Sequence, residues 1–156
     1  MSFKVYVSHS VSPGELAAVY TLAEQVSRLE MEAFVPDRLW NPHQSLPARI
    51  SSHLRNAQGM VVFATSLGSH MDWVNQELDE GGRGKQTLAV IDQGILVSGF
   101  PEEGLVYIDR GDITATMSEV ASKLAGLKLE KEHREAVGWL ALGGLLLFSL
   151  LASQRK

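Results

Sequence analysis

The chain contains no cysteine, and this absence excludes several kinds of chemistry. A protein without thiols has no disulfide bonds, no zinc site built from cysteine and no cysteine nucleophile, and this composition suits a reducing compartment. The five histidines form no His-x-x-x-His pair, and no acid-rich cluster stands at ligand spacing, so we expect no metal site.

Positive charge is also scarce. Lys and Arg number 14 against 18 Asp and Glu, which gives a net charge of -4, and the basic residues are scattered. We therefore expect no nucleic-acid partner. The glycines at 81–84 are not a phosphate-binding loop, because the Gly-Lys-Ser/Thr ending is missing and a strand pattern follows. The N-terminal residues enter a strand pattern without a charged leader and a long apolar run, so no secretory signal is expected.

Short apolar runs alternate with helical patterns along the first four fifths of the chain. With 156 residues and 45% hydrophobic content, one compact domain is expected. A polar turn, Ser8-His9-Ser10, is expected to end the first strand, and Ser45 to cap the second helix, whose pattern residues include Leu46 and His53. Strands alternating with helices predict an α/β fold, a parallel sheet in a three-layer sandwich. We expect strands at 3–7, 32–36, 60–65, 87–91 and 105–108, and helices at 13–30, 46–57, 73–80 and 113–127.

The last part of the chain has a different composition. Residues 136–152 are seventeen residues without a charge, and the mixed-charge stretch 128–135 precedes them. Seventeen residues is at the short end of what crosses a hydrocarbon core of ~30 Å. A buried or oligomerisation helix is the alternative, but we predict a single transmembrane helix. More Lys and Arg stand before the span than after it, which favours a C-terminally anchored protein with its globular part in the cytoplasm. The predicted division is a domain at 1–127, a linker at 128–135 and a membrane helix at 136–152.

One pair of residues suggests chemistry. Trp73 and Glu77 stand four residues apart at the start of a predicted helix, so they share a helix face. The helix follows the apolar strand 60–65, and open α/β sheets bind ligands at the carboxyl ends of their strands. An aromatic surface beside an acid suits a planar heterocycle with a developing positive charge. The alternative is one buried ring and one solvated acid.

Three stretches in register make the chain resemble the TIR (Toll/interleukin-1 receptor) domain family over about residues 3–127. The first is VYVSHS at 5–10. The second is FVPDR at 34–38, followed by Pro42 and the stretch SLP at 45–47. The third comprises Ser66, Ser69 and the stretch WVNQEL at 73–78. The resemblance implies a flavodoxin-like fold with a five-stranded parallel sheet.

The third stretch is similar to the signature of TIR domains that cleave NAD+. The resemblance therefore implies an NAD+ nucleosidase, a hydrolase of the nicotinamide–ribose bond with linear or cyclic product, acting in bacterial defence or signalling. It implies that Glu77 is catalytic and that NAD+ is the substrate, with no further cofactor. Implied partners are a second copy of the chain or another TIR protein. The matching positions for substrate binding are Trp73, His9, Ser10, Arg38 and Ser69.

Three alternatives remain open at this point. Arg38 suits either a phosphate of the substrate or an ion pair with Asp37 or another neighbour. The whole domain suits a non-catalytic scaffold that acts by TIR–TIR contact, with Glu77 as a surface acid. The same fold also suits other nucleotide chemistry, such as nucleotide transfer or synthesis of an NAD-derived signal.

Overall fold

The computed structural model describes residues 2–69, 71–82, 85–95 and 102–153; for residues 137–153 it describes the backbone but not the side chains. The chain divides into two compact units, residues 1–124 and 125–156. The first unit contains the sheet and the helices that cover it.

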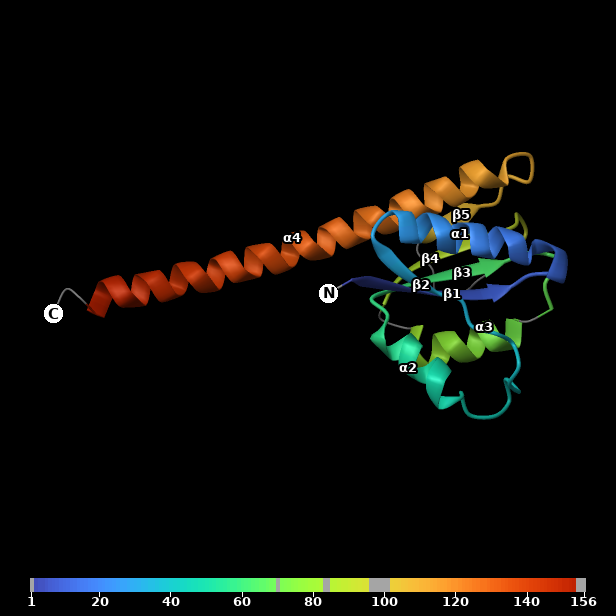
Figure 1. Cartoon of the computed structure of the whole chain (residues 1–156), viewed down its shortest axis with the longest axis horizontal. Coiled ribbons are helices and arrows are strands. Elements are labelled where there is room, and N and C mark those ends of the chain that lie inside the picture. Colours follow the sequence, from blue (N-terminus) through green and yellow to red (C-terminus); the bar gives the residue numbers. More distant parts are fainter. Residues whose placement is uncertain (1, 70, 83–84, 96–101, 154–156) are drawn as a thin grey trace. The chain divides into compact units, whose positions relative to one another are not determined.

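Five strands form one parallel sheet in the order β2-β1-β3-β4-β5 (Figure 1). This is the strand order of flavodoxin-like folds, so the predicted fold class is confirmed for the sheet. β1 and β3 occupy central positions, which explains why both are buried along almost their whole length. The strands are β1 (Phe3–Ser10), β2 (Met31–Phe34), β3 (Gly59–Ala64), β4 (Gln86–Ile91) and β5 (Leu105–Tyr107).

Helices cover both faces of the sheet, as the three-layer prediction requires. α1 and the first part of α4 lie on one face, and α2 and α3 lie on the other (Figure 1). A 3₁₀ turn at Pro13–Glu15 precedes α1, and a π-helical turn at Leu78–Gly82 follows α3. A further 3₁₀ turn, Glu102–Gly104, precedes β5. The helices are α1 (Leu16–Arg28), α2 (Ala48–Asn56), α3 (Met71–Glu77) and α4 (Ile113–Ser153).

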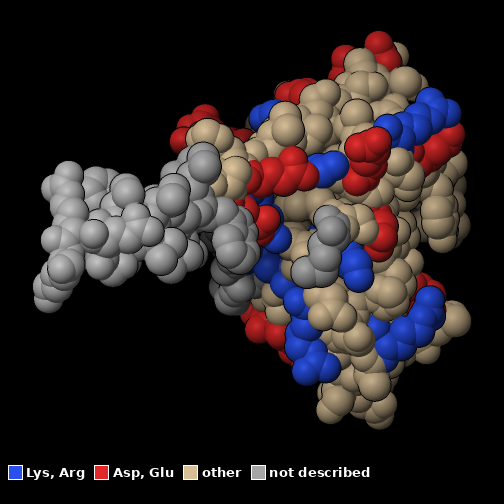
Figure 2. All heavy atoms as spheres, turned by 60° about the vertical axis from the view of Figure 1, so that its left-hand side comes forward, with Lys and Arg blue, Asp and Glu red and all other residues tan. Residues whose placement is uncertain are grey.

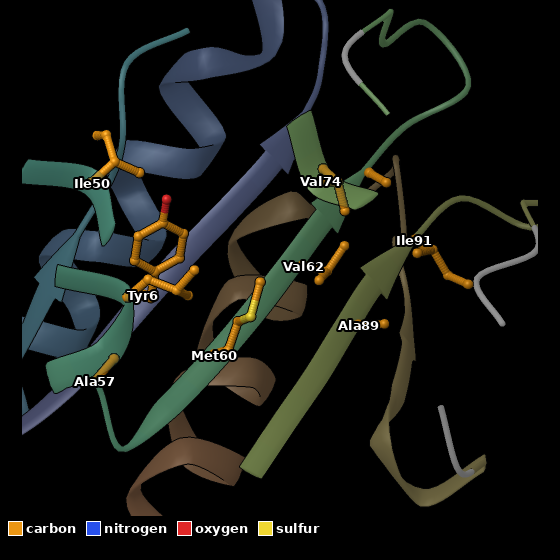
Figure 3. Packing of buried hydrophobic residues seen from close by; sticks show 10 residues of the cluster. Tyr6, Ile50, Ala57, Met60, Val62, Val74, Ala89 and Ile91 are labelled. Atoms are coloured by element: carbon orange, nitrogen blue, oxygen red, sulfur yellow. The ribbon is translucent and has the colours of Figure 1, made fainter. Parts of the chain in front are cut away.

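A buried apolar cluster joins α2 and α3 to the sheet (Figure 3). Alternate residues of each strand point to this face because side chains in a strand alternate between its two sides. α3 contributes Val74, which has no exposed surface. This packing fixes α3 against β1, and the functional residues described below depend on it. The cluster comprises Tyr6, Ile50, Leu54, Ala57, Met60, Val62, Ala64, Val74, Ala89 and Ile91.

The first strand is longer than predicted. The expected turn Ser8-His9-Ser10 is part of β1, and the three residues pair with residues 62–64 of β3. The prediction was wrong because polar residues at the end of an apolar run usually leave the sheet. Here β3 continues beside residues 8–10 and pairs with them, whereas β2 pairs only with residues 3–6, and the three polar side chains are buried.

The second helix begins later than predicted. Its N-cap is Pro47, not Ser45, and Leu46 lies outside the helix. A residue that precedes proline is restricted to extended conformations, so Leu46 does not adopt helical angles. His53 is exposed, and its ring stacks on Phe34 with centroids 3.7 Å apart.

Residues 125–153 of the second unit are helical. α4 continues through residues 128–135, which the sequence suggested as a linker, and side chains four residues apart pair along it. Lys128 and Glu132 approach to 4.0 Å, and Arg134 also pairs with Glu130. Such pairs stabilise an exposed helix.

No helix within the fully described part of the chain is both long enough and apolar enough to cross a bilayer. The span predicted at 136–152 lies, apart from its first residue, among residues whose side chains are not described. It stays a prediction.

Acidic and basic side chains are interspersed on the face that Figure 2 presents. This mixture follows from a composition in which 14 basic and 18 acidic residues are scattered along the sequence.

Candidate functional site around Glu77

Glu77 is a fully buried carboxylate between α3 and the sheet. It lies at the last position of α3, three residues after Val74, so both side chains face β1. β1 presents Tyr6 and Ser8 to the same face, because residues two apart in a strand point the same way. The sequence suggested that Glu77 stands at the carboxyl edge of the sheet. The structure places it instead beside the second half of β1, beneath α3.

Three side chains hold this carboxylate. The Ser8 hydroxyl donates to Oε1 over 2.8 Å, and the Tyr6 hydroxyl donates to Oε2. Nη1 of Arg38 lies 2.7 Å from Oε1, and the side chains of Arg38 and Glu77 are 8% and 0% exposed. Both carboxylate oxygens therefore have protein partners, and one of these partners is a cation.

Burial dominates the protonation of the site. Removal from water raises the pKa of Glu77, and the Arg38 cation with the hydrogen bonds from Tyr6 and Ser8 opposes that rise without cancelling it. The pKa of the Tyr6 phenol is also raised, first by burial and then by the neighbouring Glu77 charge, so Tyr6 remains a hydrogen-bond donor. A carboxylate with a raised pKa is poised for a role in chemistry or is strongly coupled to its partner.

Arg38 reaches Glu77 from the irregular segment 35–47 between β2 and α2. Its Nη2 donates to the backbone carbonyl of His9 over 2.8 Å, and its guanidinium lies 5.4 Å from the centre of the Trp40 ring. Arg38 does not pair with Asp37, which instead lies 3.6 Å from Arg49. Arg38 was predicted either to bind a substrate phosphate or to form an ion pair. The structure shows an ion pair, and its partner is Glu77, which the sequence did not suggest.

Two tryptophans fasten the segment 35–47 to α3. The Trp73 indole N–H donates to the backbone carbonyl of Trp40 over 2.9 Å, and the two rings meet edge to face with centroids 6.4 Å apart. The Trp40 indole N–H donates to Gln76 over 2.9 Å. Trp73 therefore binds the segment that carries Arg38, and its predicted contact with a substrate stays a prediction.

The other expected binding residues are not gathered at the carboxylate. His9 is buried, and its imidazole Nε2 lies 2.9 Å from the carbonyl of Pro36, while its backbone carbonyl accepts a hydrogen bond from Arg38. Ser10 is buried at the end of β1 beneath Gly68, whose Cα approaches so closely that a Cβ there would lie 2.0 Å from the Ser10 carbonyl oxygen. Ser69 is exposed.

Sequence reasoning missed Tyr6 and Ser8. Both stand in a run that reads as a strand followed by a turn, and a tyrosine within such a run is usually a core residue. The sequence feature that could have identified them is their spacing of two residues, which places two hydroxyl groups on one face of the same strand.

A second charged cluster lies at the carboxyl ends of the strands. Arg110, which follows β5, donates through Nε to Asp92 over 3.0 Å and through Nη2 to Glu15 over 3.1 Å. Asp92 directly follows β4 and also accepts the backbone N–H of Ser66 over 2.8 Å. The hydrogen bond from Arg110 is the main reason that the pKa of Asp92 lies below its usual range. Thr65 donates to Glu15 over 2.7 Å, which ties the end of β3 to the same cluster.

A cavity of about 270 Å³ adjoins this cluster. Arg110 and Glu15 line one part of it, and Ala18, Phe63 and Ile113 are among its apolar lining residues. It is lined from α1, β3 and the start of α4, whereas the Glu77 site is built from α3 and β1.

The fold has counterparts among solved structures. The chain resembles one chain from the crystal structure of the RPS4 and RRS1 TIR domain heterodimer, with a TM-score of 0.62 and 12% identity over 80% of this chain and 96% of that one. It also matches a response regulator receiver domain from Bacillus halodurans, with a TM-score of 0.46 and 15% identity over 79% and 97% of the two chains. An archaeal flavodoxin matches with a TM-score of 0.47 and 11% identity over 78% and 98%.

The first of these likenesses establishes a TIR-like fold. No known family profile matches the sequence, and no curated protein is similar to it.

Proposed function

We propose that this TIR-fold chain is an NAD+ nucleosidase in which Glu77 stabilises the ribosyl cation that forms when the nicotinamide bond breaks. The observation that carries the proposal is a glutamate without exposed surface and with a raised pKa, paired with an arginine whose guanidinium lies 5.4 Å from the centre of the Trp40 ring. A buried carboxylate costs several kcal/mol unless it is paired, so its presence calls for a function or a compensating partner. The resemblance of the stretch 73–78 to the signature of NAD+-cleaving TIR domains supports this function.

The chemistry needs one acid and a water molecule. The glycosidic bond breaks with its electrons passing to the pyridinium ring, so nicotinamide leaves as a neutral molecule and needs no proton. The positive charge that develops on the ribose is stabilised by the Glu77 carboxylate. Water then adds to the sugar carbon and releases a proton. Tyr6 and Ser8 orient the carboxylate from β1, and the edge-to-face pair of Trp40 and Trp73 offers aromatic surface for the heterocycle.

Nicotinamide release from NAD+ tests this proposal. The protein is clustered on liposomes, because a two-dimensional surface raises the local concentration and favours self-association. Glu77→Gln keeps the shape of the side chain and removes its charge, so we expect the rate to fall by a factor of about 100 or more. Glu80→Gln, an exposed acid in the turn that follows α3, is the matched control. If wild-type protein releases no nicotinamide under these conditions, the proposed NAD+ nucleosidase activity is refuted.

A second candidate function is a non-catalytic scaffold that binds another TIR domain. One observation favours it: Tyr6, Ser8 and Arg38 satisfy Glu77 completely, as expected for a structural residue. The similar structure is also a heterodimer of two TIR domains, which supports TIR–TIR association in this chain. Intact NAD+ together with a stable complex between two TIR chains would favour the scaffold over the enzyme.

We further propose that residues 136–152 anchor the protein in a membrane, with the first unit in the cytoplasm. The support is the sequence itself: seventeen uncharged residues with three Lys and Arg in the eight residues before them. Carbonate extraction of membranes from expressing cells tests the anchor. Full-length protein is expected to stay with the membrane and a chain ending at residue 127 to be released; release of both chains contradicts the anchor.

A further inference from the structure

Glu77 has no access to a substrate in the described conformation. Its exposed fraction is 0%, and both its oxygens are occupied by protein groups. A ribosyl cation has to lie directly against the carboxylate to be stabilised. If the proposed function holds, at least one partner of Glu77 must therefore leave before the reaction.

The three partners differ in how firmly they are held. Tyr6 and Ser8 belong to β1, which pairs with β2 and β3, and both are fully buried. Arg38 belongs to the irregular segment 35–47, which side-chain contacts fasten to α3. Moving Arg38 requires only that this segment shifts, whereas moving Tyr6 or Ser8 requires the sheet to open. Of the three partners, Arg38 is therefore the one outside the sheet.

The position of Arg38 also matches what the substrate needs. Its guanidinium is a planar, delocalised cation, 2.7 Å from Oε1 of Glu77 and 5.4 Å from the centre of the Trp40 ring. The positively charged end of NAD+ is a planar pyridinium next to the sugar that becomes cationic, and it requires the same two features, a carboxylate and an aromatic face.

From this correspondence we infer that Arg38 is an internal competitor of the substrate, a cation that occupies the place of the nicotinamide riboside end and keeps Glu77 closed until the segment 35–47 moves. This inference rests on the proposed function, and it assigns Arg38 the opposite role to that of a phosphate ligand. A phosphate ligand raises substrate affinity, whereas an internal competitor lowers it.

The competitor predicts a specific kinetic pattern. When only a fraction of the molecules is open, the apparent dissociation constant equals the intrinsic constant divided by that fraction. Arg38→Gln removes the cation, so the apparent KM for NAD+ is expected to fall on the order of tenfold. Activity should also depend less on clustering.

A second variant covers the case in which Arg38→Gln does not fold. Gln76 accepts from the Trp40 indole and donates to the Gln44 carbonyl, so Gln76→Ala loosens the segment and leaves Arg38 and Glu77 in place. We expect its KM to fall about tenfold, a factor of about three for each of these two hydrogen bonds of the closed form. Asn75→Ala, an exposed position on the same helix, is the matched control and should leave KM unchanged.

Binding of the N-methylnicotinamide cation, measured by calorimetry, separates this inference from the proposed function. Tighter binding of this probe to Arg38→Gln and Gln76→Ala than to wild type supports the role of Arg38 as an internal competitor, whether or not nicotinamide is released. Absence of nicotinamide release refutes only the proposed enzymatic activity. Conversely, an active wild type whose Gln76→Ala variant shows unchanged KM and unchanged binding of the probe overturns the competitor and leaves the enzyme standing. If the Arg38→Gln variant folds and its KM is higher than that of wild type, the internal-competitor inference is also overturned, and Arg38 is instead a ligand of a substrate phosphate.

Discussion

The molecule contains two clusters in which an arginine binds carboxylates, and they differ chiefly in burial. Arg38 and Glu77 are 8% and 0% exposed, whereas the side chains of Arg110 and Asp92 are 46% and 10% exposed. Both clusters have short contacts, of 2.7 Å and 2.5 Å. The pKa of Glu77 is nevertheless raised, chiefly by burial, while that of Asp92 is lowered, chiefly by the hydrogen bond from Arg110. Distance alone therefore does not set the behaviour of an ion pair; access to water does.

The largest expected difference between the clusters is in stability. Arg38→Gln leaves a buried carboxylate without its cation, and breaking a buried pair in this way costs about 3–5 kcal/mol. Arg110→Gln removes a partly exposed cation, whose pairs contribute about 1 kcal/mol or less. Urea denaturation of the two variants measures both losses. Equal losses would show that Glu77 is not sealed from water in solution.

The sequence predicted most of the fold that positions these two clusters. The α/β class, the parallel sheet and the strand positions followed from apolar runs that alternate with helical patterns, and the structure confirms them. Strand and helix ends were less accurate, as at Ser10 and Pro47, because neighbouring strands and a single proline decided them.

The contacts within the sites were harder to predict than the fold. Glu77, Trp73 and Arg38 were each chosen from the sequence, yet the pairing of Arg38 with Glu77 joins residues 39 positions apart and depends on how the segment 35–47 folds back. The Asp92–Arg110 cluster was missed. Its signal was present, since polar residues follow the apolar runs of β4 and β5, and the carboxyl ends of parallel strands meet at one edge.

The two clusters should respond to pH in opposite directions. Because folding raises the pKa of Glu77 above its ordinary value of 4.5, the folded state binds more protons, and the stability contributed by this group falls as pH rises from that value through the raised pKa. Folding lowers the pKa of Asp92 below 3.8, so its contribution is present above that pH and is lost as pH falls through the lowered pKa.

Free energies of unfolding from pH 3 to 8 for wild type, Glu77→Gln and Asp92→Asn measure this difference. The advantage of wild type over Glu77→Gln should shrink with rising pH, by about 1.4 kcal/mol for each unit of pKa shift. Its advantage over Asp92→Asn should instead disappear only below about pH 4. Parallel pH profiles for the two variants would mean that burial does not shift the pKa values of Glu77 and Asp92 in opposite directions.

The smallest expected effect is the response to salt. At 1 M salt the screening length shortens to about 3 Å, so an ion pair that water reaches weakens while a sealed pair does not. Double-mutant cycles isolate the two couplings: Arg38→Gln with Glu77→Gln, and Arg110→Gln with Asp92→Asn. The Arg110–Asp92 coupling, less than about 1 kcal/mol at low salt, should fall by half or more between 0.05 and 1 M NaCl. The Arg38–Glu77 coupling should change little, and if it falls in proportion, the segment 35–47 opens often enough in solution for ions to reach Glu77 without any activating partner.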